Sequence, residues 1–163
     1  PLTILSKLMG IRLKSSTYSR DGTKENPFPY EDWGYDWALN HIKTRDGAAP
    51  VYFNIMANKT NLNAQTFDLV TKEQSSPVRA TTSRTWSIVG DEYSFDPEKT
   101  MYFHWFLIKE GDHGAPWKNK KAEQDYEALK SFLNQSGKFE LVDRHKCPDG
   151  QDLILYRQAG LKL

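Results

Sequence analysis

The sequence predicts an α/β fold: a mixed sheet with a parallel portion, helices packed on it, and a C-terminal antiparallel hairpin. Two apolar runs, 51–57 and 101–109, are rich in aromatic and β-branched residues and have the length of buried strands. Segments with helical periodicity separate the predicted strands, as in sheets that are covered by helices. Two further strand-like segments near the C-terminal end are joined by a Pro-Asp-Gly turn.

The first half of the chain contains two predicted helices and two predicted strands. Apolar residues in 30–46 recur at the helical period, with acidic residues early and basic residues late, and an Asp-Gly pair ends the segment. The run 51–57 follows Pro50 and predicts a buried strand. Residues 61–72 carry a weaker helical pattern, and the alternating, Thr-rich segment 78–85 favours a half-exposed strand.

The second half contains the central strand, the clearest helix and the hairpin. Aromatic and branched residues dominate 101–109, which we expect at the centre of the sheet. Apolar residues in 118–135 form one stripe between charged residues, which predicts an amphipathic helix packed on the sheet. Residues 139–145 and 153–157 are predicted strands on either side of the turn 148–150.

The composition predicts a single α/β domain, 30–163, after a lead-in of residues 1–29. Apolar and basic residues alternate in that lead-in, which fits a juxtamembrane linker and equally a short terminal helix or strand packed on the domain. The formal net charge of +1 argues against a nucleic-acid binder. The apolar run 101–108 is far shorter than the roughly 20 residues of a membrane-spanning helix. Because the chain begins with Pro1 and shows no signal-peptide pattern, we expect it to be part of a longer protein.

No familiar catalytic or cofactor motif occurs in the sequence, so we expect no catalytic residue, metal site or cofactor within this domain. The pairs Asp91-Glu92 and Asp112-His113 contain metal-ligating side chains, but neighbours on an extended chain point to opposite sides, which favours solvated loops. His104, inside the apolar run, is interpreted as a hydrogen-bonded core or sheet-face histidine. His41 and His145 are predicted at the surface.

Any ligand surface is predicted on the loops that follow the strands, where an α/β sheet leaves a crevice. Basic side chains there could meet a phosphate or carboxylate, polar ones could hydrogen-bond hydroxyls, and an indole could stack on a sugar ring. The alternative is that Asp112 and Asn61 only cap turns and helix starts. The candidate ligand-binding residues are Asn61, Asn63, Arg84, Lys109, Asp112, His113 and Trp117.

One stretch carries a family resemblance. Residues 103–114, FHWFLIKEGDHG, contain a WFLxKxGDxG pattern. This stretch resembles bacterial, notably cyanobacterial, polyprenyl-phosphate-sugar-dependent membrane glycosyltransferases related to the protein O-mannosyltransferases (family 39 type). Further pieces that agree with the resemblance occur in order between residues 30 and 158: DWAL at 36–39, NLN at 61–63, PDG at 148–150 and LYR at 155–157.

The resemblance implies a role for this chain as the soluble, extracytoplasmic domain of such an enzyme. It implies that the membrane portion of the same polypeptide carries the catalytic carboxylates and uses a lipid-linked sugar donor. It also implies a place on the periplasmic face of a bacterial inner membrane, and a role in shaping or gating the site of a sugar or polypeptide acceptor. Two other interpretations stay open: a stand-alone carbohydrate- or peptide-binding module, and a small enzyme whose site is assembled from loop residues such as Arg84, Asp112 and His113.

Overall fold

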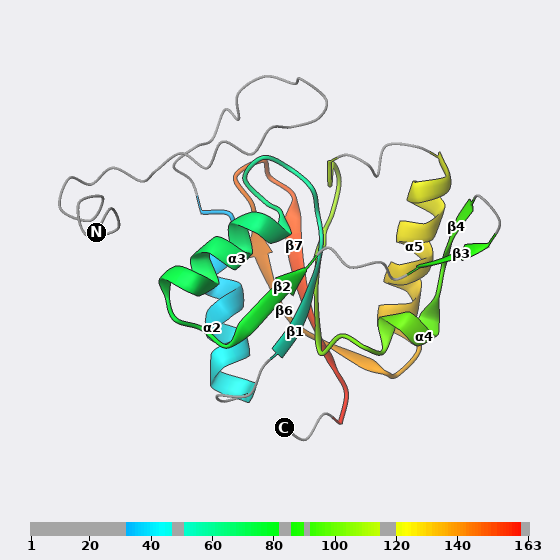
Figure 1. Ribbon diagram of the computed structural model, residues 1–163. Helices are drawn as coiled ribbons and strands as arrows, with labels where there is room; N and C mark the ends of the chain where they lie inside the picture. Colours follow the sequence, from blue (N-terminus) through cyan, green and yellow to red (C-terminus); the bar gives the residue numbers. More distant parts are fainter. Residues whose placement is uncertain (1–31, 47–50, 82–85, 90–91, 115–119, 161–163) are drawn as a thin grey trace.

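A five-stranded mixed sheet, in the order β2-β1-β5-β7-β6, forms the centre of the structure (Figure 1). This computed structural model describes residues 32–46, 51–81, 86–89, 92–114 and 120–160. The strands are β1 (Val51–Met56), β2 (Val78–Thr81), β5 (Trp105–Lys109), β6 (Phe139–Lys146) and β7 (Asp152–Gln158). β1 runs parallel to both β2 and β5, whereas β7 runs antiparallel to both β5 and β6. The predicted α/β class, with its parallel portion and C-terminal antiparallel hairpin, is confirmed.

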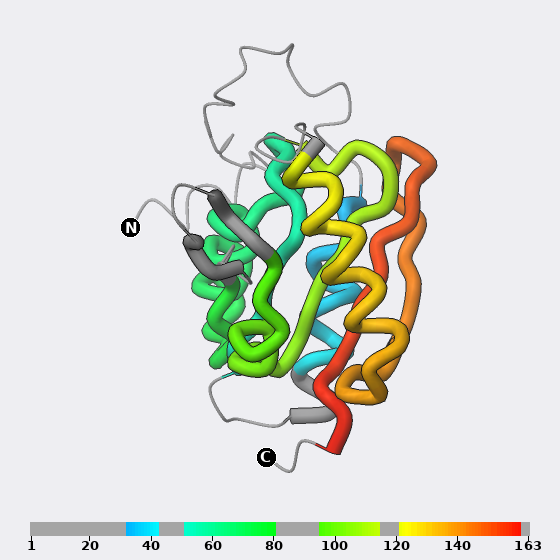
Figure 2. Tube along the Cα trace, turned by 90° about the vertical axis from the view of Figure 1, so that its right-hand side faces the viewer, coloured from blue at the N-terminus to red at the C-terminus, as the bar shows by residue number. Residues whose placement is uncertain are grey.

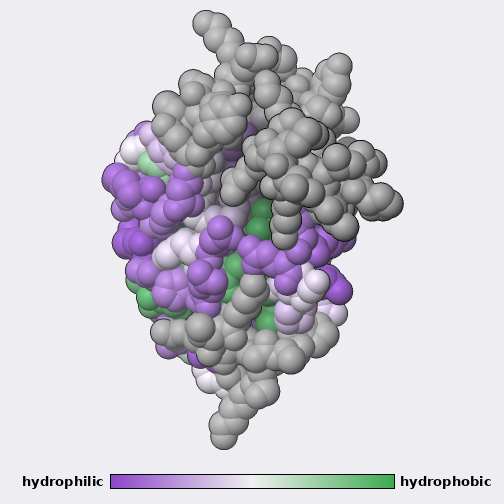
Figure 3. Space-filling view, turned by 90° about the vertical axis from the view of Figure 1, so that its left-hand side faces the viewer, coloured by the Kyte–Doolittle hydropathy of each residue, from purple (hydrophilic) through white to green (hydrophobic). Residues whose placement is uncertain are grey.

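Helices cover both faces of this sheet (Figure 1). One face carries α2 (Tyr35–Asp46) and α3 (Ala64–Glu73). The other carries α4 (Pro97–Thr100), α5 (Lys120–Gln135) and a two-stranded sheet of β3 (Trp86–Val89) and β4 (Glu92–Phe95). Figure 2 looks onto α5, and Figure 3 shows the opposite side, where hydrophilic residues predominate among those coloured. No helix in the described ranges has the length and apolar character needed to cross a membrane.

Side chains of the sheet alternate between two apolar cores, as the two-residue period of a strand requires. Phe53 and Trp105 belong to the core beneath α2 and α3. Phe106 and Ile108 belong to the core beneath α5. Lys109, the last residue of β5, falls on the same side as Trp105 by this alternation. A lysine is thus the last residue of a fully buried strand, at the edge where the parallel strands end.

The central strand begins at Trp105, so the prediction that it starts at Met101 was wrong. The cause lies in the preceding residues. Asp96 accepts the backbone N–H groups of the first turn of α4, and Pro97 occupies the first helical position. Turn hydrogen bonds continue as far as Phe103, whose N–H donates to the carbonyl three residues earlier. These bonds hold the start of the apolar run out of the sheet, although β5 still has the predicted central place.

The remaining predicted helices and strands are confirmed, with small shifts at their ends. The helix predicted for 61–72 is α3, and the helix predicted for 118–135 is α5. Three elements were missed: the one-turn helix α4 and the two strands of the β3–β4 hairpin. Residues 82–85, predicted as the end of a strand, and the lead-in 1–29 lie outside the described ranges.

His41 and His145, predicted at the surface, lie there half-buried, with side chains 29% and 19% exposed. Both imidazoles contact the ring of Trp37, at centroid distances of 5.6 and 5.2 Å. The His41 Nε2 also lies 2.8 Å from the carboxylate of Asp143. The reason is that α2 packs against β6, so the Trp37 ring covers part of each imidazole. His104, directly before β5, is also half-buried, and its backbone N–H donates to the carbonyl of Tyr52.

Candidate functional site

The loops that follow β1 and β5 meet at the carboxyl edge of the sheet. The N–H of Asn58 donates to the carbonyl of His113 over 2.7 Å, and Asn58 forms an isolated parallel bridge with Gly114. Glycine permits this approach, because its φ is +86° and a Cβ there would stand 2.2 Å from the carbonyl oxygen of Asn58. The two loops are therefore held together as one unit.

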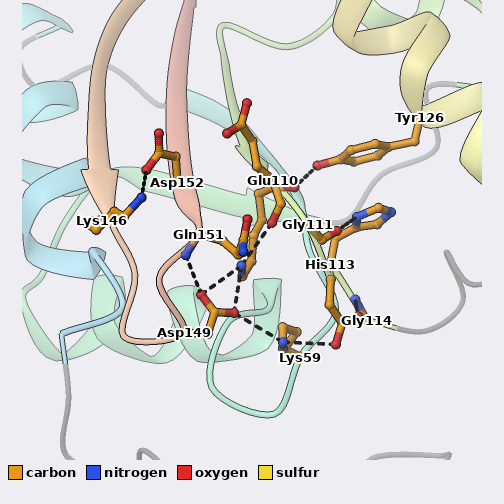
Figure 4. A network of polar contacts seen from close by, with 12 residues as sticks. Lys59, Glu110, Gly111, His113, Gly114, Tyr126, Lys146, Asp149, Gln151 and Asp152 are labelled. Carbon is orange, nitrogen blue, oxygen red and sulfur yellow. Dashed lines mark hydrogen bonds and ion pairs between the residues drawn. The ribbon is translucent and has the colours of Figure 1, made fainter.

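Four charged side chains gather at this edge, Lys59, Lys109, Asp112 and Asp149, and we term them the lysine–aspartate clasp. Lys59 and Asp149 of the clasp are labelled in Figure 4. The Lys59 Nζ lies 3.2 Å from a carboxylate oxygen of Asp112 and 3.4 Å from one of Asp149. The Lys109 Nζ lies 2.9 Å from the nearer carboxylate oxygen of Asp149 and 3.1 Å from the carbonyl oxygen of Glu110. Because Asp149 comes from the turn between β6 and β7, the clasp ties three loops together.

Lys109 distinguishes the clasp from ordinary surface ion pairs, since its side chain is 0% exposed. A buried ammonium group is costly unless an opposite charge compensates it. Asp149 supplies that charge. Burial alone would raise the pKa of Asp149, but the hydrogen bonds from Lys109 and from the Gln151 N–H, together with the charges of the two lysines, hold the pKa of this carboxyl below its usual value. Asp149 is therefore ionised at neutral pH.

His113 closes the same edge on the side of α5. Its ring stacks on that of Tyr126, with centroids 4.0 Å apart and an angle of 10° between the planes. The Tyr126 hydroxyl donates to the carbonyl of Lys109. The His113 Nδ1 lies 2.8 Å from the carbonyl oxygen of Gly111, which can only accept, so Nδ1 carries a hydrogen. Burial lowers the pKa of His113, although nearby carboxylates act in the opposite direction, and the imidazole is neutral at neutral pH.

Three of the predicted ligand-binding residues, Lys109, Asp112 and His113, are brought together at this edge. Asp112 belongs to the clasp and also accepts the N–H of Gly114 over 3.1 Å. This is the turn-capping role predicted from the sequence as the alternative to ligand binding. Lys109 and His113 are buried, so their side chains face the protein interior. Ligand binding by these residues stays a prediction.

The two predicted asparagines lie in the loop that contacts this edge. Asn63 caps α3: its side-chain oxygen accepts the N–H of Thr66 over 2.9 Å, and its amide donates to the carbonyl of Lys59 over 2.8 Å. The carbonyl of Asn61 accepts the hydroxyl of Tyr35. Both contacts stabilise the loop after β1. The two remaining candidates, Arg84 and Trp117, lie outside the described ranges.

Lys59 and Asp149 are the clasp residues that were not among the candidates. Asp149 lies in the predicted Pro-Asp-Gly turn, and a turn aspartate beside a strand that ends in lysine was the available signal. In the described part of the chain, no three His, Cys, Asp or Glu side chains are grouped so as to hold a metal ion. Burial raises the pKa of the Cys147 thiol to about 11, so this thiol is protonated at neutral pH.

Comparison of the chain with protein-family models, with curated proteins and with solved structures yields no match.

Proposed function

We propose that this chain is an extracytoplasmic accessory domain of an integral-membrane glycosyltransferase, and that it shapes or gates the acceptor site. In this proposal the membrane portion of the same polypeptide transfers a sugar from a lipid-phosphate carrier. The domain itself holds no cofactor and lies on the periplasmic face of a bacterial inner membrane. Its partners are that membrane portion and a sugar or polypeptide acceptor.

The observation that carries the proposal concerns the ionisable side chains at the carboxyl edge of the sheet. They are paired with each other or buried. A general acid or base needs access to its substrate and a pKa near the working pH. The Asp149 carboxylate has a lowered pKa and faces a buried ammonium group. The His113 side chain is only 6% exposed. A set of loops tied in this way is suited to presenting a fixed surface to a partner.

The family resemblance supports the same interpretation. The letters K and D of the WFLxKxGDxG stretch are Lys109 and Asp112 in this chain. Both belong to the clasp, and the final glycine of the stretch is Gly114, at the close approach to Asn58. The stretch therefore coincides with the residues that tie the loops together, which is the part of an accessory domain that must keep its shape.

The first test is the coding sequence upstream of Pro1. Repeated spans of about 20 apolar residues are expected there, as in a protein with many membrane helices. Their absence would exclude a membrane glycosyltransferase as the full-length protein and would favour a stand-alone module.

The second test is transfer activity. The full-length protein in lipid vesicles, supplied with a polyprenyl-phosphate sugar and a panel of acceptors, should transfer sugar, and the isolated domain should not. Asp112→Ala, at the exposed end of the clasp, should lower transfer by the full-length protein, whereas Lys146→Ala, at a separate exposed ion pair, should not. Turnover by the isolated domain, or full activity of the Asp112 variant, would contradict the proposal.

A further inference from the structure

A row of three side chains crosses the amino-terminal edge of the sheet, at the opposite end from the clasp. Arg79 lies on β2, Tyr52 on β1, and His104 directly before β5. Tyr52 and Arg79 are partners in the parallel register of β1 and β2, so their side chains share one face of the sheet. The rings of Tyr52 and His104 contact each other, with centroids 5.7 Å apart. The three groups therefore stand side by side on three neighbouring chain segments.

This row is open to solvent. The Tyr52 residue is 52% exposed, and Tyr102, two residues before His104, is 75% exposed. Among the other large hydrophobic residues whose side-chain exposure the structure describes, only Leu69 and Leu141 are comparably exposed. The exposed surface of the Tyr52 ring is therefore accessible to a ligand beside His104.

Arg79 also differs from the other arginines whose side chains the structure describes. Arg144 and Arg157 lie 3.7 and 3.6 Å from carboxylates of Asp152 and Glu140. For Arg79, no carboxylate partner occurs among the side chains that the structure describes, and its guanidinium makes a long 3.5 Å contact with the carbonyl of Val78. Among the described side chains its charge is thus uncompensated, which makes the row complementary to an anionic ligand.

We propose that Arg79, Tyr52 and His104 form a binding site for an acidic saccharide, with the guanidinium pairing with a uronic acid carboxylate and the Tyr52 ring packing on the sugar. A guanidinium group matches a carboxylate through two parallel hydrogen bonds. An aromatic ring gives apolar contact to the C–H face of a pyranose, and phenol and imidazole groups can hydrogen-bond its hydroxyls.

The dimensions fit this ligand. Neighbouring strands lie about 4.8 Å apart, so three segments span roughly 10 Å, which is the scale of one or two sugar rings. A bilayer surface would require a much wider aromatic and basic area. The site uses no residue of the clasp and does not depend on the proposed role of the domain in a membrane glycosyltransferase.

The test is titration of the protein with digalacturonate, by calorimetry and by NMR. The wild-type protein should bind the disaccharide, and Arg79→Gln and Tyr52→Ala should each weaken binding by roughly tenfold or more, the loss of one charged pair or one stacking ring. Arg144→Gln, an exposed arginine with carboxylate partners, is the matched control and should bind within about twofold of wild type. The dimethyl ester of the same disaccharide, which keeps the rings and removes the charge, should bind as weakly to wild type as digalacturonate binds to Arg79→Gln.

Three results would overturn the proposal. The first is no binding of digalacturonate at millimolar concentration. The second is equal binding by wild type, Arg79→Gln and Arg144→Gln, which would place the ligand elsewhere. The third is equal binding of the acid and its ester, which would exclude recognition of the carboxylate. Thermal unfolding and circular dichroism of each variant establish that it is folded. Tyr52→Phe keeps the ring, so comparing it with Tyr52→Ala distinguishes loss of ring packing on the sugar from loss of the fold.

Discussion

Removal of the Asp149 carboxylate should destabilise the protein far more than removal of a surface ion pair. Asp149→Ala leaves the ammonium group of Lys109 buried with no opposite charge beside it. Breaking a buried pair from one side costs about 3–5 kcal/mol. We expect a value near the lower end, about 3 kcal/mol, because the Asp149 side chain is 19% exposed and water can partly replace it. Urea unfolding followed by tryptophan fluorescence measures the loss.

A double variant distinguishes the cost of the unpaired Lys109 charge from the cost of losing the Asp149 side chain. Lys109→Met combined with Asp149→Ala removes both charges, and the double variant should be more stable than Asp149→Ala alone. Lys146→Ala is the surface control: its ammonium group lies 3.0 Å from Asp152, but the side chain is 69% exposed, and the expected cost is below about 0.5 kcal/mol. A cost below about 1 kcal/mol for Asp149→Ala, or a double variant no more stable than the single one, would refute the reasoning.

Three further outcomes follow from the carboxyl edge of the sheet. Gly114→Ala should lower the free energy of unfolding by about 2 kcal/mol or more. The loss should be clearly larger than for Gly137→Ala, because Gly137 has a similar positive φ but open space around it. Equal losses would contradict the close approach of Gly114 to Asn58. Acidification below about pH 6.5 should lower stability through His113, because burial lowers its folded-state pKa and the unfolded chain takes up the proton first. The loss should continue until the pH has fallen below the folded-state pKa of His113. His113→Phe should flatten this part of the plot of unfolding free energy against pH. A flat plot for the wild type from about pH 7 to pH 5 would contradict this prediction. The Cys147 thiol, buried and with a pKa of about 11, should react with a disulfide reagent only as the protein opens, and rapid labelling of the native protein would be inconsistent with this.

The sheet and its long helices could be predicted because their signals are local. The apolar run 51–57 and the amphipathic segment 118–135 each determine their own type of element. The β3–β4 hairpin was missed, although Gly90-Asp91 between two strand-like segments is the two-residue signal of such a turn. The start of the central strand was misplaced because one capping aspartate, Asp96, outweighs the apolar character of the residues that follow α4.

The site could be predicted only in part, because its energetics depend on distant residues. The position of Lys109 at the end of a strand indicates the edge where loops meet. Its burial does not follow from the sequence, since the compensating Asp149 lies 40 residues further along the chain. Likewise, the clash that requires a glycine at position 114 is with the backbone of residue 58. Such pairings exist only once the sheet is assembled.

The position of β7 sets the order in which the sheet can be completed. β7 lies between β5 and β6, although it follows β6 in the chain. During synthesis, β6 therefore emerges from the ribosome before the strand that will join it to the rest of the sheet. In the described structure β6 pairs with β7 alone, so until β7 is made it must stay unpaired or pair wrongly with the open edge of β5. Folding of this domain is then coupled to the arrival of residues 152–158, and a chain that stalls before them exposes two strand edges that a chaperone or a protease can recognise.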